Sequence, residues 1–387
     1  MTESSWTELI TAIHANEHQA VLAVTGGGSR AISQLLQVPG ASRTVLEAVV
    51  PYSAAALADW LGSAADQACS APTARAMAMA SWIRARALSP KSDPHQLVGV
   101  GATASLVSDR PKRGEHRVHV AIQTATTTAT YSLVLAKDDR VRLAEETLAA
   151  QLLLLGLAKS CQLDVADTRS IFEKDLQGNE QIKSSLQQAN AEWTELLLGE
   201  RSQVCYPASH HAQSVFPGAF NPPHVGHKRI AAIAAERLGC PVSYELSITN
   251  VDKPPLDFFE IDTRLKQLRD FDGQTPILLS DAPTFPAKAA LFPGCTFVVG
   301  ADTIARIANP KYYRGEATGF AAAIQQIADG GCRFLVFGRQ LQGKFCVLSD
   351  IELPQALLDL CDEVSAADFR EDISSSEVRS ATSLSES

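Results

Sequence analysis

The chain has 387 residues, of which 45% are hydrophobic and 20% are charged, so it is long enough for two or three globular domains with substantial cores. Its net charge of −9 argues against broad binding to nucleic acid or to an anionic membrane, because both need a basic surface. The eight cysteines are scattered and form no CxxC pair, which indicates reduced thiols rather than a disulfide framework or a zinc site.

The N-terminus carries acidic residues and has neither the basic segment nor the apolar run of a secretory signal. The most apolar run, Ala149–Ala158, is too short to cross a bilayer. We therefore expect a cytoplasmic protein with no membrane partner and no nucleic-acid partner. A homo-oligomer remains compatible with the sequence.

The first region, residues 1–162, is predicted to be an α/β domain. The apolar segment Ala20–Val24 predicts a strand that ends at the glycine cluster Gly26–Gly28, and a helix is expected over Ser29–Leu36. The spacing of apolar residues predicts a long amphipathic helix over Val141–Lys159, which would cover the sheet. Segments rich in β-branched residues predict further strands at Leu97–Val100, Val118–Gln123 and within Thr124–Ala136.

The second region, residues 163–212, is more polar and is predicted to be a helical connector. Within Gln181–Leu198 the apolar residues recur at helical spacing, at Ile182, Leu186, Ala189, Trp193 and Leu197. This pattern fits a surface helix and a helix packed between domains equally well.

The third region, residues 213–387, alternates apolar strand-like runs with helical stretches, which predicts a Rossmann-like parallel sheet with helices on both faces. Ligands of such sheets bind at the carboxyl ends of the strands. The predicted strands are Ser214–Phe216, Val242–Ile248, Ile277–Ser280, Thr296–Val299 and Arg333–Phe337.

The segment SVFPGAFNPPHVGH lies at the first strand-to-helix junction of this region. Gly218 has no Cβ and allows the backbone to approach a phosphate closely. The helix is expected to begin near His224 and to end at Leu238, with Gly239 as its stop. His224 and His227 are three residues apart and share one face of the first turn. Two imidazoles at the positive end of a helix would stabilise a phosphate that gains charge in a transition state.

GAFNPPHVGH resembles the HxGH signature of the nucleotidyltransferase superfamily. Val299–Thr303 resembles the Gly-x-Asp segment of nicotinate and nicotinamide mononucleotide adenylyltransferases. Ile373–Arg379 resembles their closing ISSTxIR motif, with Ser376 where threonine is usual. The three segments occur in the family's order, and the resemblance covers residues 213–380.

The resemblance implies an enzyme that transfers AMP from ATP to a mononucleotide and releases pyrophosphate. The 5′-phosphate of the substrate would attack the α-phosphorus directly, so no protein nucleophile is needed. Mg²⁺ would bridge phosphate oxygens and keep several waters, and no complete metal cage of protein ligands is expected.

Residue roles follow from the same resemblance. His224 and His227 would contact the ATP phosphates, as would the turn that contains Gly218, Ala219 and Phe220. Arg379 would bind the β- and γ-phosphates, which Ser375 and Ser376 would cap. Asp302 would contact a ribose or the adenine, although it also fits a simple loop cap, and Gly300 belongs to the same predicted substrate-binding segment. Lys253 and Arg264 are expected to bind substrate, although both also fit solvated charges.

The N-terminal region also resembles a family, over residues 5–162. The turn Val38–Ser42, the segment Pro51–Ser53 and the segment Leu97–Gly101 are similar to the CinA C-terminal domain family, whose active members deamidate nicotinamide mononucleotide. The family's nucleophilic serine is replaced by Thr25 or Ala23, depending on the alignment, and its lysine by Leu57. Because a hydroxyl without an activating base is a poor nucleophile, we expect no deamidase activity. Binding of a pyridine nucleotide or a role in oligomerisation stays open.

Two alternatives to mononucleotide adenylyl transfer remain. The first keeps the fold and changes the substrate, as in a phosphopantetheine- or cytidylyl-type transferase. The second is a non-catalytic nucleotide sensor or scaffold. The sequence does not separate nicotinamide from nicotinate mononucleotide as the acceptor.

Overall fold

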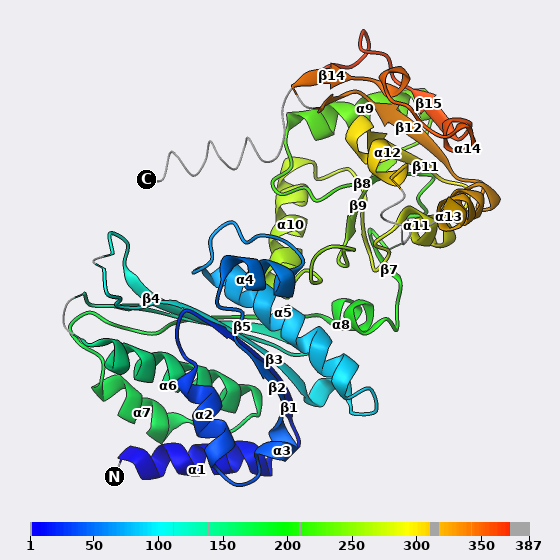
Figure 1. The fold of residues 1–387 in the computed structure, drawn as a ribbon. Coiled ribbons are helices and arrows are strands. Elements are labelled where there is room, and N and C mark those ends of the chain that lie inside the picture. Colours follow the sequence, from blue (N-terminus) through cyan, green and yellow to red (C-terminus); the bar gives the residue numbers. More distant parts are fainter. Residues whose placement is uncertain are drawn as a thin grey trace. The chain divides into compact units, whose positions relative to one another are not determined.

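The computed structural model describes residues 2–110, 112–137, 140–208, 210–309, 317–341 and 343–371. Its contacts divide the chain into two compact units (Figure 1). Unit 1 consists of Met1–Thr194 together with Asp252–Glu260, and unit 2 of Glu195–Val251 together with Ile261–Ser387.

Unit 1 is built on one mixed sheet of order β2-β1-β3-β4-β5-β6. Strand β1 pairs in parallel with β2 and β3, whereas β3, β4, β5 and β6 pair antiparallel. The strands predicted in the first region are confirmed. The strands are β1 (Gln19–Thr25), β2 (Val45–Val49), β3 (Leu97–Ser105), β4 (His116–Gln123), β5 (Thr127–Leu135) and β6 (Lys183–Gln188).

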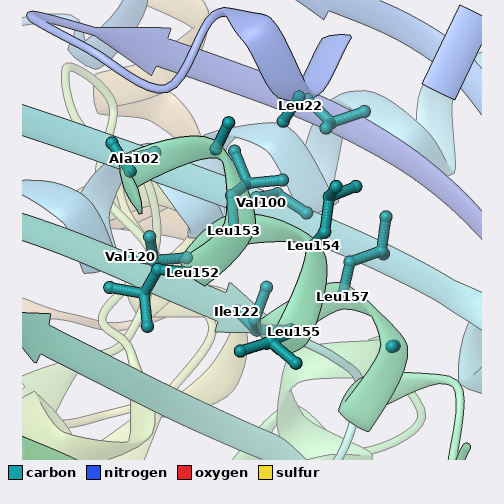
Figure 2. Packing of buried hydrophobic residues seen from close by; sticks show 14 of the residues in the cluster. Leu22, Val100, Ala102, Val120, Ile122, Leu152, Leu153, Leu154, Leu155 and Leu157 are labelled. Atoms are coloured by element: carbon teal, nitrogen blue, oxygen red, sulfur yellow. The ribbon is translucent and has the colours of Figure 1, made fainter. Parts of the chain in front are cut away.

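The two faces of this sheet carry different residues because side chains alternate along a strand. On one face, apolar residues of β3 and β4 pack against the leucines of α6, as Figure 2 shows for Val100, Ile122 and Leu153. On the other face, Gly99 brings α5 close, since a Cβ there would lie 2.1 Å from the Ala78 carbonyl oxygen. The helices are α1 (Thr2–Ala15), α2 (Arg30–Gln37), α3 (Ala41–Thr44), α4 (Ala54–Leu61), α5 (Ala71–Leu88), η1 (Pro94–Gln96), α6 (Arg142–Ser160) and α7 (Ala166–Lys174).

The helix predicted over Gln181–Leu198 is wrong in its first half. Lys183–Gln188 forms β6 and pairs antiparallel with β5, and only Ala191–Leu198 is helical, as α8. These residues form a strand rather than a helix because the edge of β5 offers backbone donors and acceptors that pairing with β6 satisfies. Asn190 marks the true start of the helix, because its Oδ1 accepts the Trp193 N–H at 2.8 Å. The residues up to Thr194 group with unit 1 and do not form a separate helical connector.

Unit 2 contains the predicted α/β sheet, with order β15-β12-β11-β8-β9-β10-β7. All neighbours pair in parallel except β7, which is antiparallel to β10. All five predicted strands are confirmed. The strands are β7 (Gln203–Tyr206), β8 (Ser214–Pro217), β9 (Val242–Ser247), β10 (Ile277–Ser280), β11 (Thr296–Gly300), β12 (Arg333–Phe337) and β15 (Cys361–Glu363), beside a small hairpin of β13 (Arg339–Leu341) and β14 (Lys344–Cys346).

The faces of the second sheet are buried by helices and by aromatic residues. Val215 and Phe297 belong to one apolar cluster, which also includes Ala289 of α11 and Ile324 of α13. Phe216, from the same strand as Val215, contacts Tyr244 with ring centroids 6.0 Å apart. The helices are α9 (Val225–Leu238), α10 (Phe258–Phe271), α11 (Phe285–Leu291), α12 (Ala301–Ile307), α13 (Ala317–Asp329), η3 (Leu348–Asp350) and α14 (Gln355–Leu358).

None of the helices in the described parts of the chain combines the length and the apolar character that a membrane span requires.

Candidate functional site

The turn between β8 and α9 lies at the carboxyl edge of the second sheet. Strand β8 is flanked by β11 and β9, so the turn sits where neighbouring strand ends converge. The Gly218 N–H donates to the Glu245 carbonyl of β9 at 3.0 Å and fixes the start of the turn. As predicted, α9 starts beside His224, which is its N-cap, and ends at Gly239, whose φ is 67°.

Gly218 has a packing reason to be glycine. A Cβ there would lie 2.6 Å from Cζ of Phe220, whose ring is 1% exposed and lies against Tyr244 and His227. Phe220 itself has a φ of 45°, in the left-handed region that residues other than glycine seldom adopt. Such strained backbone is found preferentially at functional turns. The ring of Phe220 is therefore a core group, and a phosphate could meet only the backbone of this turn.

His227 is held as a neutral imidazole with a defined tautomer. Its Nδ1 accepts the backbone N–H of His224 at 3.1 Å, so the proton of the neutral ring is assigned to Nε2. Burial, together with the charges of His224 and Arg339, lowers the pKa of His227 to about 3. The rings of His224 and His227 have centroids 3.8 Å apart, and both residues are buried. His227 can thus donate a hydrogen bond to an anion without carrying charge.

Gly300 and Asp302 occupy the neighbouring strand end, where β11 meets α12. A Cβ on Gly300 would lie 2.4 Å from Oδ1 of Asp302 and 2.8 Å from Cγ of Arg339, so a side chain there would displace both residues. Arg339 follows β12, and its Nε lies 3.8 Å from Oδ1 of Asp302. Sequence analysis missed Arg339. The available signal was a charged residue two positions after the buried strand end at Phe337.

Arg264 of α10 also reaches the turn. Its Nη1 donates a long hydrogen bond, 3.4 Å, to the carbonyl oxygen of Ala219. Lys253 is exposed and belongs to the segment Asp252–Glu260, whose contacts are with unit 1. Its predicted role in substrate binding stays a prediction.

The last described residues run along α9 toward its first turn. Arg237 pairs with Asp368 at 2.6 Å, and Arg229, closer to the start of the helix, pairs with Glu371. A Cβ on Gly226 would lie 3.8 Å from Cβ of Glu371. The predicted phosphate ligands Ser375, Ser376 and Arg379 lie outside the described residues.

A buried ion pair lies beneath the turn, and it too escaped the sequence analysis. Lys288 Nζ contacts both oxygens of the Glu245 carboxylate at 2.6 and 2.7 Å, and the Ser280 hydroxyl donates to the same carboxylate. The carbonyl oxygen of Glu245 accepts the Gly218 N–H, so the pair and the turn share one strand residue. Within residues that the structure describes, no group of three His, Cys, Asp or Glu is placed to hold a metal ion. The expected Mg²⁺ stays a prediction.

Unit 1 has a similar turn after β1, and its own carboxylate fills it. Glu146 Oε2 accepts the Gly28 N–H at 2.8 Å, and Oε1 accepts the Ser29 hydroxyl at 2.9 Å and the Arg30 N–H at 3.1 Å. Arg142 binds the Gly26 carbonyl at 2.7 Å.

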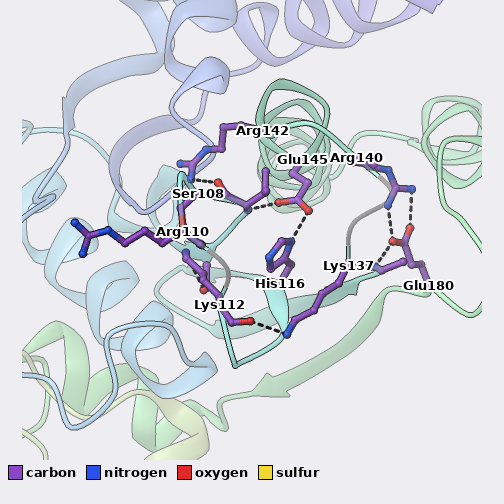
Figure 3. A network of polar contacts seen from close by, with 12 residues as sticks. Ser108, Arg110, Lys112, His116, Lys137, Arg140, Arg142, Glu145 and Glu180 are labelled. Atoms are coloured by element: carbon purple, nitrogen blue, oxygen red, sulfur yellow. Dashed lines mark hydrogen bonds and ion pairs between the residues drawn. The ribbon is translucent and has the colours of Figure 1, made fainter.

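Glu145, in the first turn of α6, contacts His116 at 2.7 Å in the polar network that Figure 3 shows. Leu57, at the position of the family's lysine, is buried with Ala23 and Met77 in an apolar cluster.

Comparisons with known proteins find similarity to parts of the chain. Residues 215–381 match the family model described as cytidylyltransferase-like, which supports the nucleotidyltransferase superfamily and a nucleotidyltransferase activity in general for this part of the chain. No curated protein matches the chain. Among solved structures it is similar to the competence/damage inducible protein CihA from Agrobacterium tumefaciens, at 17% identity over 44% of this chain and 95% of that chain. The TM-score is 0.31, which is too low to support an argument.

Proposed function

We propose that unit 2 transfers AMP from ATP to the 5′-phosphate of nicotinamide or nicotinate mononucleotide, forming a dinucleotide of the NAD type and pyrophosphate. The observation that carries the proposal is the neutral His227, with its proton assigned to Nε2, at the N-terminus of α9. The family match supports nucleotidyl transfer in general. The segment Val299–Thr303, which resembles the Gly-x-Asp segment of these adenylyltransferases, supports the mononucleotide acceptor.

The proposed chemistry needs alignment and charge stabilisation rather than a protein nucleophile. His224 and His227 donate to the phosphate oxygens, and the positive end of the α9 helix dipole adds to the stabilisation. The acceptor's 5′-phosphate attacks the α-phosphorus in line, and pyrophosphate leaves. Mg²⁺ bound with ATP would reduce the charge repulsion between the two phosphate groups.

Ser375, Ser376 and Arg379 are proposed to bind the β- and γ-phosphates. The support comes from the described segment before them, because Glu371 contacts Arg229 in the first part of α9. Ile373, where the serine-rich motif begins, follows Glu371 by two residues. A guanidinium and two hydroxyls suit a polyphosphate.

Release of pyrophosphate tests this proposal. The full chain is incubated with ATP and Mg²⁺ and with nicotinamide mononucleotide, nicotinate mononucleotide or phosphopantetheine, and each reaction is repeated with EDTA. We expect pyrophosphate and a dinucleotide with one or both pyridine mononucleotides, and none with EDTA. Turnover with phosphopantetheine alone would replace the proposed acceptor, and no turnover with any acceptor would exclude the proposed adenylyl transfer.

Cytidylyl transfer is a second candidate, because the matching family model is described as cytidylyltransferase-like. The same assay with CTP in place of ATP separates the two. Pyrophosphate release that requires CTP would favour the second candidate. Tight nucleotide binding without pyrophosphate from either nucleotide would favour a sensor or scaffold.

We further propose that unit 1 is a CinA-like domain without deamidase activity. Leu57 offers no base, and the Gly26–Gly28 turn is filled by Glu146. Ammonia release from nicotinamide mononucleotide in the absence of ATP is the test, and we expect none above the buffer control. Ammonia release that grows with protein concentration would contradict this proposal.

A further inference from the structure

A nucleotide substrate in the candidate site needs positive charge that the neutral His227 does not supply. A nucleoside triphosphate brings several negative charges, whereas His227 is neutral near pH 7 because burial lowers its pKa to about 3. Neutral imidazoles give directional hydrogen bonds but no compensating charge. A side-chain cation at the same edge of the sheet would offset part of this charge together with Mg²⁺ and Arg379, on the premise that unit 2 binds a nucleotide as proposed above.

Arg339 is placed to supply that charge. The sheet order puts β12 next to β11 and β11 next to β8, so Arg339, Asp302 and His227 all follow neighbouring strand ends. Its stem packs on Gly300, and the side chain is 23% exposed. The charge of Arg339 also contributes to the lowered pKa of His227.

We propose that Arg339 binds the polyphosphate of the nucleotide substrate and that Asp302 positions the Arg339 guanidinium when no substrate is bound. The distance of 3.8 Å from Nε to Oδ1 is too long for a hydrogen bond, and the Asp302 side chain is 48% exposed. Such a pair is weak, so a phosphate can displace the carboxylate. The planar guanidinium then donates two hydrogen bonds to phosphate oxygens.

Equilibrium binding of inorganic pyrophosphate in the presence of Mg²⁺ tests this role without requiring turnover. The full chain is compared with Arg339→Gln and Arg339→Lys by calorimetry. Arg333→Gln is the matched control. Arg333 begins β12, the strand that Arg339 follows, and pairs with the exposed Asp362 at the opposite end of that strand.

We expect Arg339→Gln to weaken pyrophosphate binding at least about tenfold, as for loss of a charged hydrogen bond. The lysine variant should fall between this variant and the natural protein, and the control should stay within about twofold, as for loss of a surface ion pair. Asp302→Asn should bind pyrophosphate more tightly, since it removes the competing carboxylate. Unchanged binding by Arg339→Gln, weaker binding by Asp302→Asn, or no binding by the natural protein would overturn the proposal.

Folding and function are separated within the same set of proteins. Thermal unfolding checks that Arg339→Gln is folded, and if it is not, Asp302→Asn alone decides by the direction of its effect. Binding that depends on Arg339 without turnover of any acceptor would reject the proposed function and keep this inference. Turnover together with unchanged pyrophosphate binding by Arg339→Gln would reject this inference and keep the proposed function.

Discussion

Units 1 and 2 each carry a glycine-containing turn between a buried parallel strand and a helix, and the two turns are finished differently. After β1, the amide groups of Gly28 and Arg30 are bound by the carboxylate of Glu146. After β8, the backbone N–H of His224 is bound by the neutral ring of His227. A carboxylate fills an anion site, whereas a neutral imidazole whose Nε2 carries the proton can serve one. Glycine at a strand end therefore does not identify a ligand site by itself.

The largest effect on stability is expected from the Glu245–Lys288 ion pair beneath the turn between β8 and α9. Lys288→Met leaves the Glu245 carboxylate buried without its cation, which should destabilise unit 2 by about 3–5 kcal/mol. Hydrogen exchange of peptides from α9 and α11 measures the loss in unit 2 separately from unit 1. Lys344→Met is the control, because that lysine is 75% exposed.

A double variant, Lys288→Met with Glu245→Leu, should recover most of that stability, because no charge is left buried. If Lys288→Met alone exchanges like the natural protein, the pair does not support the turn.

Replacement of His227 should have the next largest effect. His227→Ala removes the Nε2–H donor and should lower kcat for pyrophosphate release about a hundredfold or more, as for loss of a transition-state donor. The rate is measured at saturating ATP and acceptor. His95→Ala is the control, since His95 is an exposed residue of unit 1. A His227→Ala rate equal to that of the control would remove His227 from the mechanism.

Substitution in the turn after β1 should change only the stability of unit 1. Glu146→Ala deprives three donors of their acceptor and should cost unit 1 about 1–2 kcal/mol, since the site is partly open to water. All four tryptophans, Trp6, Trp60, Trp82 and Trp193, belong to unit 1, so their fluorescence in a urea titration follows this unit. Pyrophosphate release should be unchanged. A loss of rate similar to that of His227→Ala would contradict the purely structural role of the turn after β1.

The sequence predicted the strands of unit 2 and the start of α9 because these depend on local patterns, namely apolar runs, Gly239 and the histidine spacing. It missed Arg339 and the Glu245–Lys288 pair, because sheet order brings these residues together across long stretches of chain. It assigned a helix to residues 181–188 because Ile182 and Leu186 fit a helical period. The available edge of β5 decided in favour of a strand, and no local signal reports that edge.

The smallest effect concerns pH. With a pKa near 3, His227 should stay neutral from pH 5 to pH 8, so its imidazole resonances should not titrate there, whereas free histidine does. The stability that this residue adds is complete above the unfolded pKa of about 6.5. It falls as the pH drops toward 3, because only the unfolded chain binds the proton. An NMR titration with a midpoint between pH 5 and pH 8 for His227 would contradict the assigned protonation state.

Hydrogen exchange with and without ATP and Mg²⁺ tests the contrast between the turns most directly. Peptides that cover residues 218–230 and peptides that cover residues 26–35 are compared in the same sample. We predict slower exchange on nucleotide binding in the first set and no change in the second. Slower exchange at residues 26–35 together with unchanged exchange at residues 218–230 would contradict the account.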